Sequence, residues 1–293
     1  PRGVGDPPGA GLGRIVVADV GNSRIKLAVV AGLATGCVAG GHAEGGRTDG
    51  GHAEGLPKLA GHRAIDSRDF NPDGVTRWLG QLGTESATVL VASVNDTAAA
   101  RLEAALGEFS VTKHRPLRQR RITAAHLPLG VALPHPQRVG IDRLAAAAAA
   151  AVVKRPGKPA VVVNCGTAAT VDIVAPDGTF LGGAILPGPA LLARALAEGT
   201  SRLPAVTLLE QGPPPALPGR STEDAIAAGI GWGSRGAVGR LVAEATRAAG
   251  TDADVILTGG WSHAIRDDLP AAIEVPDLVL AGIALAAPRA LAR

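Results

Sequence analysis

The stretch VVVNCGTAATVDIV, residues 161–174, decides how this chain is interpreted. Two β-branched runs flank Gly166 and Thr167, a pattern that predicts two strands joined by a tight glycine turn. Asn164 and Asp172 stand where a buried sheet favours apolar side chains. Polar groups beside a glycine turn indicate a ligand held against the backbone, although a solvated edge hairpin has the same pattern. A second hairpin of this kind elsewhere in the chain would favour the ligand.

Such a hairpin occurs near the start, in RIVVADVGNSRIKLAVVAG, residues 14–32. Both stretches have the order strand, polar residue, any residue, glycine, small polar residue, strand. Asp19 and Asn164 hold the equivalent polar position, about half the chain apart. This repeat predicts an internal duplication of an α/β unit, with both glycine turns brought into one cleft. Chance similarity of two hairpins is the alternative.

Composition narrows the class of protein. The chain has 293 residues, of which 46% are hydrophobic, and this length suits one large or two medium domains. No apolar run approaches the roughly 20 residues of a membrane span, so no membrane partner is expected. The net charge is +3, and RPLRQRR at 115–121 is the densest basic run. We expect it to be a solvated loop or helix face, with no nucleic acid as partner.

The cysteines indicate a reducing environment. Cys37 and Cys165 are too few and too widely spaced for a disulfide framework or a zinc site. A cytoplasmic localisation is therefore expected.

Two segments are expected to lack regular structure. Residues 1–13 contain no signal-peptide pattern and are expected to be a disordered lead-in. Residues 36–62 are rich in Gly and His and repeat GGHAEG, which predicts a flexible surface insertion; metal capture by His42 and His52 is a less favoured alternative.

The remaining chain divides at a proline-rich connection. Residues 127–138 contain three prolines and are predicted to join the two halves. We therefore expect an N-terminal domain at 14–135, which includes the insertion, and a C-terminal domain at 136–293.

Periodicity predicts the main helices and strands of these domains. An N-cap at Asp96 is expected for the second of the helices. The predicted helices are 72–83, 96–109, one starting near Ile141, 222–231, 234–249 and 277–292, and strands are predicted at 87–94 and 255–260.

The first glycine turn has the residues of a phosphate site. Glycine lets backbone N–H groups approach a polyphosphate without obstruction by a Cβ atom. Asp19 just before the turn suits water-mediated Mg²⁺ binding, and Lys26 could supply positive charge. Neither a P-loop nor a G-x-G-x-x-G fingerprint occurs, so the common phosphate sites at helix N-termini do not apply.

A second candidate site is VGIDR at 139–143, which opens the Ala-rich helix. Asp142 near a helix N-terminus could simply stabilise the helix dipole. Alternatively, Asp142 is a general base that accepts a hydroxyl proton, while Arg143 grips an anionic substrate. That arrangement would suit phosphoryl transfer, in which positioning and charge stabilisation carry most of the catalysis.

Together these motifs resemble those of the type III pantothenate kinases, which belong to the actin, sugar-kinase and Hsp70 ATPase superfamily. The motifs occur in the family's order and cover nearly the whole chain from residue 14. They are DVGNSRIK (19–26), PHPQRVGIDR (134–143), NCGTAATVD (164–172), GGAILPG (182–188), STEDAIAAGI (221–230) and ILTGG (256–260). The resemblance implies an α/β fold of two duplicated ribonuclease-H-like domains, as in actin, with a nucleotide cleft between them.

The resemblance also implies roles for single residues. Asp19 would lie near Mg²⁺, and Asp142 would be the base that activates the terminal hydroxyl of pantothenate. Residues implied to bind ATP are Asp19, Val20, Gly21, Asn22, Ser23, Arg24, Ile25, Lys26, Thr167, Gly259 and Gly260. Residues implied to bind pantothenate are Leu133, Gly140, Ile141, Asp142, Arg143 and Thr222.

Further implied partners are a monovalent cation, K⁺ or NH₄⁺, and a second copy of the chain. The family forms homodimers with the substrate site at the interface, so Thr222 would come from the neighbouring subunit.

Two positions depart from the family's pattern. The family usually has aspartate at Asn164, where the monovalent cation is bound, so weaker cation binding or a lapsed requirement is expected. It usually has tyrosine at Leu133, so weaker pantothenate binding is expected.

These observations leave three hypotheses for function. The first is an ATP-dependent kinase that makes 4′-phosphopantothenate, the entry step to coenzyme A. The second is a non-catalytic nucleotide-binding regulator of the same fold. The third is a kinase for another small hydroxyl substrate. The role of Asp172 stays open between a structural one and a contact near the metal.

Overall fold

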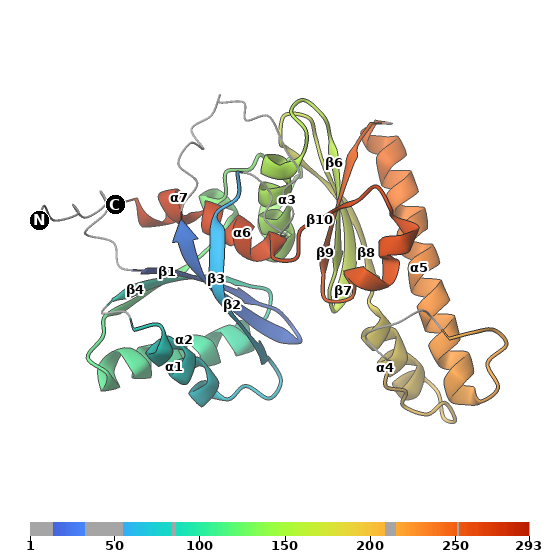
Figure 1. The fold of residues 1–293 in the computed structure, drawn as a ribbon, viewed down its shortest axis with the longest axis horizontal. Helices are drawn as coiled ribbons and strands as arrows, with labels where there is room; N and C mark the ends of the chain where they lie inside the picture. Colours follow the sequence, from blue (N-terminus) through green and yellow to red (C-terminus); the bar gives the residue numbers. More distant parts are fainter. Residues whose placement is uncertain (1–13, 33–54, 84–85, 209–214, 251, 293) are drawn as a thin grey trace, which may run out of the picture.

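The structure is a computed structural model that describes residues 14–32, 55–83, 86–208, 215–250 and 252–292. It contains two five-stranded sheets (Figure 1). The first sheet has the spatial order β3 (Lys58–Asp66), β2 (Arg24–Gly32), β1 (Arg14–Val20), β4 (Ala87–Ser93) and β5 (Leu117–Arg121). The second has the order β8 (Phe180–Pro187), β7 (Ala168–Val174), β6 (Ala160–Cys165), β9 (Asp254–Gly259) and β10 (Ile273–Glu274).

The two sheets repeat one topology. In the first, β1 pairs antiparallel with β2 and parallel with β4, while β3 and β5 complete the edges. In the second, β6 pairs antiparallel with β7 and parallel with β9, and β8 and β10 complete the edges in the same directions. The predicted α/β fold of two duplicated domains is therefore confirmed.

Helices α3 (Ile141–Val153) and α6 (Leu278–Leu285) lie between the two sheets (Figure 1). Their buried side chains join both sheets in one core cluster. The two helices approach so closely that a Cβ atom at Gly282 would lie 1.9 Å from the carbonyl oxygen of Ala145. The alanine run of α3 therefore serves close helix packing inside this chain.

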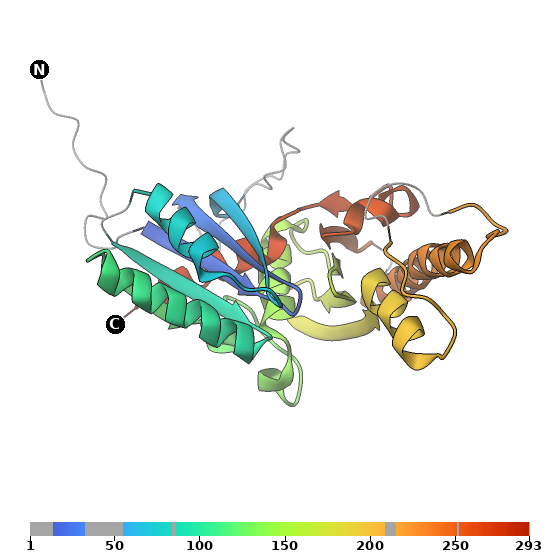
Figure 2. The same cartoon turned by 90° about the horizontal axis from the view of Figure 1, so that it is seen from below.

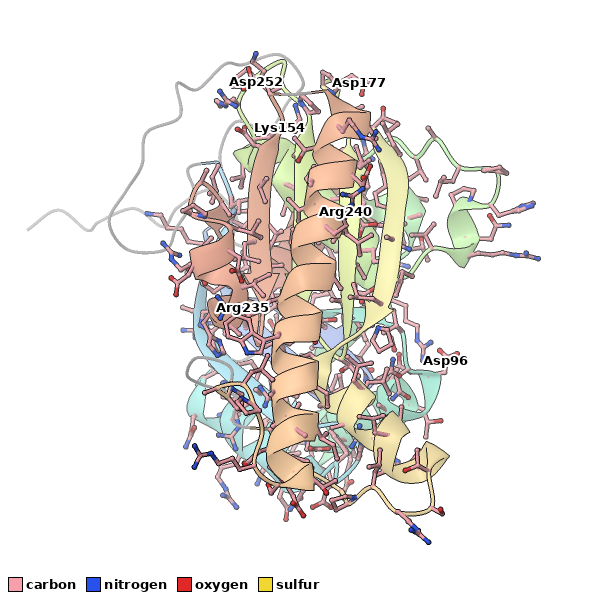
Figure 3. The ribbon with its side chains drawn as sticks, turned by 90° about the vertical axis from the view of Figure 1, so that its right-hand side faces the viewer. Asp96, Lys154, Asp177, Arg235, Arg240 and Asp252 are labelled. Carbon is pink, nitrogen blue, oxygen red and sulfur yellow. The ribbon has the colours of Figure 1, made fainter. Side chains whose placement is uncertain are left out.

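The remaining helices cover the outer faces. Figure 2 shows α1 (Pro72–Gln81) and α2 (Asp96–Thr112) against the first sheet, where they close its second core cluster. Helix α5 (Thr222–Ala249) runs along the outer face of the second sheet (Figure 3). Helix α4 (Pro189–Gly199) packs beside the amino-terminal half of α5. The 3₁₀ helices Ala124–His126, Pro136–Arg138 and Ser262–Asp268 and the short helix α7 (Ala287–Leu291) complete the elements.

Several predicted helices and strands are confirmed within a few residues, and others are corrected. The two helices predicted at 222–231 and 234–249 are one helix, because a continuous buried face that includes Ile230, Ser234 and Val238 runs through the predicted break. The helix predicted at 277–292 is divided at Ala286, since Pro288 has no N–H to continue the first helix.

The N-cap of α2 is Asn95, whose side chain accepts from the Ala98 N–H at 3.0 Å, whereas the sequence predicted Asp96. The basic run at 115–121 contains the edge strand β5, where a loop or helix face was predicted. The insertion predicted at 36–62 ends earlier, because β3 begins at Lys58. Its residues His42 and His52, like Cys37 and the predicted lead-in, lie outside the described residues.

Among the described residues, no helix combines the length and the apolar character that crossing a membrane would require.

Candidate active site

The two glycine turns meet between the sheets. The hydroxyl of Thr167, in the turn after β6, donates a hydrogen bond to the Ser23 hydroxyl, in the turn after β1, at 2.8 Å. Both hydroxyls are half-buried. The sequence prediction that the two glycine turns come together is therefore confirmed.

Each turn is held by a side chain from another element. The Ser67 hydroxyl donates to the carbonyl oxygen of Gly21 at 2.8 Å. The Trp261 indole donates to the equivalent carbonyl of Gly166 at 2.9 Å. These two donors were not among the predicted site residues, because nothing local in the sequence shows what a distant side chain will contact. Both fix the backbone that would face a phosphate.

Asp19 is the penultimate residue of β1 and lies in cross-strand register with Lys26 of β2. Burial raises the pKa of Asp19 to about 7; the positive charge of Lys26 opposes this rise and the carboxylate of Asp142 adds to it. Burial of a carboxylate beside another carboxylate favours a bound cation, which would supply the missing positive charge.

Mg²⁺ fits this position. Among the described residues, no three metal-binding side chains gather at one point. Mg²⁺ keeps several waters and is commonly held by one or two carboxylates together with substrate phosphates. Asp19 would therefore hold the ion, with waters and phosphate oxygens as its other ligands.

Asp142 lies in the first turn of α3, after the N-cap Gly140. One of its oxygens, Oδ1, accepts the Arg143 backbone N–H at 2.8 Å, and a Cβ atom at Gly140 would lie only 2.5 Å from that oxygen. Burial raises the pKa of the Asp142 carboxyl, while Arg143 opposes the rise. Because Asp142 also raises the pKa of both Asp19 and Asp172, the three carboxylates share one electrostatic environment.

Arg143 is held by Asp172 of β7. Both carboxylate oxygens of Asp172 accept from the Arg143 Nε at 3.2 Å, and Arg143 Nη2 also donates to Oδ1. The guanidinium carbon lies 5.6 Å from the centre of the Phe180 ring. Asp172 was singled out in the sequence as an anomalous polar residue, but its partner could not be identified there.

Leu133 approaches the same region. Phe180 exchanges backbone hydrogen bonds with Gly130 (2.8 Å) and Ala132 (2.9 Å). Leu133 Cδ2 lies 3.5 Å from where a Cβ atom of Gly182 would stand. Residues 130–133, within the segment predicted to join the halves, thus pack along β8.

The second turn is closely packed. Gly259 has a φ of +106°, and a Cβ atom there would lie 2.4 Å from backbone atoms of Cys165. Gly260 follows on the surface. Asn164 is half-buried and lies in register with Thr170 and Thr258. Burial raises the pKa of the Cys165 thiol to about 12, so this cysteine is not an activated nucleophile.

Thr222 stands apart from these residues. It is exposed at the start of α5, where the Ser221 hydroxyl caps the helix by accepting the Asp224 N–H at 3.0 Å. In the described part of the chain, no hydrogen bond connects Thr222 to Asp142 or Arg143. Figure 1 shows this end of α5 extending with α4 beyond the second sheet.

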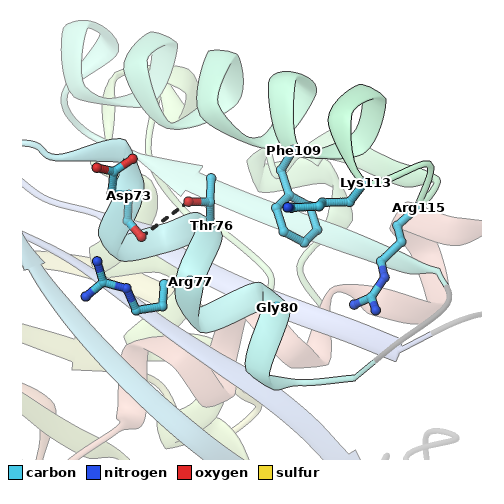
Figure 4. Close-up of a pocket in the computed structure, with 7 residues that line it drawn as sticks. All are labelled: Asp73, Thr76, Arg77, Gly80, Phe109, Lys113 and Arg115. Atoms are coloured by element: carbon cyan, nitrogen blue, oxygen red, sulfur yellow. Dashed lines mark hydrogen bonds between the residues drawn. The ribbon is translucent and has the colours of Figure 1, made fainter.

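A separate groove of about 560 Å³ lies between the outer helices α1 and α2 (Figure 4). It contains none of the residues described above. Its lining residues are Asp73, Thr76, Arg77, Gly80, Phe109, Lys113 and Arg115. The candidate active site is instead the region between the sheets, where the charged and hydroxyl side chains converge.

Comparison with known proteins gives independent evidence about the family of this chain. A family model described as type III pantothenate kinase matches residues 15–244. A type III pantothenate kinase of Rhodopirellula baltica is 36% identical over 281 residues, which cover 89% of this chain and 94% of the relative. That of Alkalilimnicola ehrlichii is 39% identical over 201 residues, 67% of this chain and 76% of the relative.

One solved structure of similar extent is the activator of the 2-hydroxyisocaproyl-CoA dehydratase from Clostridium difficile with bound ADPNP. It is 12% identical, with a TM-score of 0.45, and the likeness covers 95% of this chain and 96% of that one. This likeness is too distant to carry an argument. The family match spans more than half of the chain and includes both glycine turns and the Asp142 segment. The chain therefore belongs to the type III pantothenate kinase family.

Proposed function

We propose that this chain transfers the γ-phosphoryl group of ATP to the terminal hydroxyl of pantothenate, the first step of coenzyme A synthesis. One observation carries the proposal: Asp19, Asp142 and the two glycine turns converge between the duplicated sheets. Family membership supplies the reaction class, an ATP-dependent kinase.

Asp142 is the proposed general base. Its Oδ1 is occupied by the Arg143 N–H, which leaves Oδ2 for the hydroxyl proton. Burial makes its carboxylate more basic, and a base is most effective when its pKa approaches the working pH. Asp142→Asn should lower kcat by about 10²- to 10⁴-fold and leave ATP binding intact. A non-catalytic regulator would lose no function from this change.

The turns are the proposed phosphate site. Ser23 and Thr167 bond each other in this structure, so a bound triphosphate would require both hydroxyls to turn toward phosphate oxygens. Lys26 would add positive charge from the neighbouring strand. Mg²⁺, when bound at Asp19, supplies charge neutralisation to the phosphates.

The direct test is ADP release from MgATP with and without pantothenate, in K⁺ and in Na⁺ buffer. Pantothenate-dependent release supports the proposed kinase. Absence of release from a folded protein that binds ATP would overturn it. Release that requires a different small alcohol would favour the other-substrate kinase.

The same assay addresses the monovalent cation. Asn164 offers a neutral carbonyl oxygen where a carboxylate would attract K⁺ or NH₄⁺ more strongly. We propose that turnover is only weakly stimulated by K⁺.

We further propose a homodimer in which Thr222 of one protomer completes the site of the other. Thr222 is exposed and lies at the end of α5 that extends past the sheet. Large apolar side chains are also exposed in this half of the chain, among them Leu181 (45%), Ile185 (61%) and Trp232 (47%). An interface would remove this apolar surface from water.

Mixing two inactive variants tests the shared site. Asp142→Asn lacks the base, and Thr222→Arg would block the partner's pocket. If sites are shared, random reassociation of the two restores about a quarter of wild-type activity, because half the dimers are mixed and each mixed dimer has one intact site. Sites confined to one protomer would leave the mixture inactive.

The cytoplasmic localisation expected from the cysteines stays a prediction.

A further inference from the structure

We propose that Asp172 is a positioning residue that aims Arg143 at the carboxylate of the substrate. The inference rests on the proposed function, and it assigns a task to a buried charged residue that the reaction chemistry itself does not use.

The geometry of the pair carries the proposal. Asp172 is 2% exposed and accepts from the Nε and Nη2 edge of the guanidinium. A guanidinium has five donors in a rigid fork, so engaging this edge leaves Nη1 and its hydrogen atoms for another anion. The Phe180 ring faces the same guanidinium at 5.6 Å. Carboxylate and ring together restrict both the direction and the tilt of Arg143.

The neighbouring strand makes room for this carboxylate. Gly183 of β8 is the register partner of Asp172. A Cβ atom at Gly183 would stand 2.5 Å from Asp172 Oδ1 and 2.1 Å from the Val171 carbonyl oxygen. A side chain at this position is therefore excluded, and the glycine leaves room for the Asp172 carboxylate.

Asp172 is also expected to affect the pKa of Asp142, because both carboxylates lie near Arg143. Asp142 faces Arg143 on its own helix, Asp19 on β1 and Asp172 on β7. Burial raises the pKa of Asp142 even though Arg143 opposes the rise. Without Asp172, the guanidinium would be free to pair with Asp142, which would lower the pKa of that carboxyl and weaken it as a base.

A purely structural role is the alternative. In that case Asp172 would only compensate the buried charge of Arg143, whose side chain is 14% exposed. Loss of either partner would then reduce stability without a specific effect on the substrate's carboxylate.

The experiment measures kcat and KM for pantothenate and for its neutral alcohol analogue, pantothenol, which has a hydroxyl group in place of the carboxylate. The variants are Asp172→Asn, Arg143→Gln and the double variant, with Asp177→Asn as control. Asp177 is an exposed aspartate in the turn after β7. The double variant leaves neither buried charge unpaired, so it keeps the test available if Asp172→Asn alone folds poorly.

If Asp172 acts through Arg143, Asp172→Asn raises KM for pantothenate by about 10- to 100-fold and leaves KM for pantothenol nearly unchanged. In the Arg143→Gln background, the added Asp172→Asn change has little further effect on KM. The acidic limb of the kcat profile of Asp172→Asn shifts to lower pH, and Asp177→Asn behaves as wild type.

An equal increase in KM for pantothenate and for pantothenol would overturn the inference. Independent effects of the two substitutions on KM for pantothenate, which multiply in the double variant, would also overturn it. Both results are separable from failure of the proposed function, since a wild-type chain that does not phosphorylate pantothenate would refute the kinase before any variant is compared.

Discussion

The hairpin β1–β2 and the hairpin β6–β7 share their backbone and differ in charge. In each, a strand ends in a glycine turn whose carbonyl oxygen accepts one side-chain donor, Ser67 for the first and Trp261 for the second. At the equivalent strand position, the first hairpin has Asp19 and the second has Asn164. Duplication therefore preserved the scaffold, while a carboxylate at this strand position is present in the first copy and absent from the second.

The register partners repeat this contrast. Asp19 lies opposite Lys26, and both are half-buried, whereas Asn164 lies opposite Thr170, which is neutral. A metal-bound triphosphate needs a carboxylate on the metal side only, and hydroxyl donors suffice on the other side. We therefore expect the two turns to be chemically non-equivalent, and the variants below test how far that holds.

The largest effect is expected when the first hairpin is made to resemble the second. Asp19→Asn removes the only charge proposed to hold Mg²⁺ near the phosphates, so kcat/KM for MgATP should fall by about 10³-fold. Pantothenate-dependent ADP release measures the fall. Asp177→Asn, an exposed change in the turn between β7 and β8, is the matched control and should retain full activity. A loss below tenfold in Asp19→Asn would mean that the two turns share the metal.

The same substitution should increase stability, with a defined pH dependence. Because the folded pKa of Asp19 is about 7, against 3.8 in the unfolded chain, this residue destabilises the fold as pH rises between these values. Wild type and Asp19→Asn should thus have equal unfolding free energies near pH 4. The variant should gain up to about 4 kcal/mol above pH 7.

Chemical denaturation between pH 4 and 8, without nucleotide or Mg²⁺, measures this difference. Asp177→Asn should show the opposite sign, since backbone hydrogen bonding from Thr179 lowers the pKa of that carboxyl. A difference between wild type and Asp19→Asn that does not change with pH would show that Asp19 is ionised throughout the range.

The sequence predicted the two hairpins better than the contacts that they make with other elements. Strand and turn patterns are local, so both hairpins and the glycine turns were predictable from spacing alone. The ion pair of Asp172 with Arg143 depends on packing between β7 and α3, which no local pattern encodes. The continuity of α5 was missed for a similar reason, because burial against the second sheet outweighs the helix-weakening glycines around Trp232.

A smaller effect is expected when the second hairpin is made to resemble the first. Asn164→Asp adds a carboxylate beside the Gly166 turn and should strengthen binding of K⁺ by electrostatic attraction. The ratio of turnover in K⁺ to that in Na⁺ should increase by up to about tenfold. Titration of K⁺ at constant ionic strength measures the change, with Asn164→Ser as a neutral control. An unchanged ratio would show that the second turn has no cation role.

The smallest effects are expected from the two donors that hold the turns. Ser67→Ala and Trp261→Phe each remove one hydrogen bond to a glycine carbonyl, worth about 0.5–1.5 kcal/mol. Each change should weaken ATP binding by about 2- to 12-fold, because the turn backbone becomes free to move before phosphate binds. Equilibrium binding of a non-hydrolysable ATP analogue measures both variants under the same conditions. If both turns hold phosphate, the two losses are similar and add in the double variant. A loss confined to Ser67→Ala would show that only the first turn contacts nucleotide, and that the Ser23–Thr167 bond does not mark a shared phosphate site.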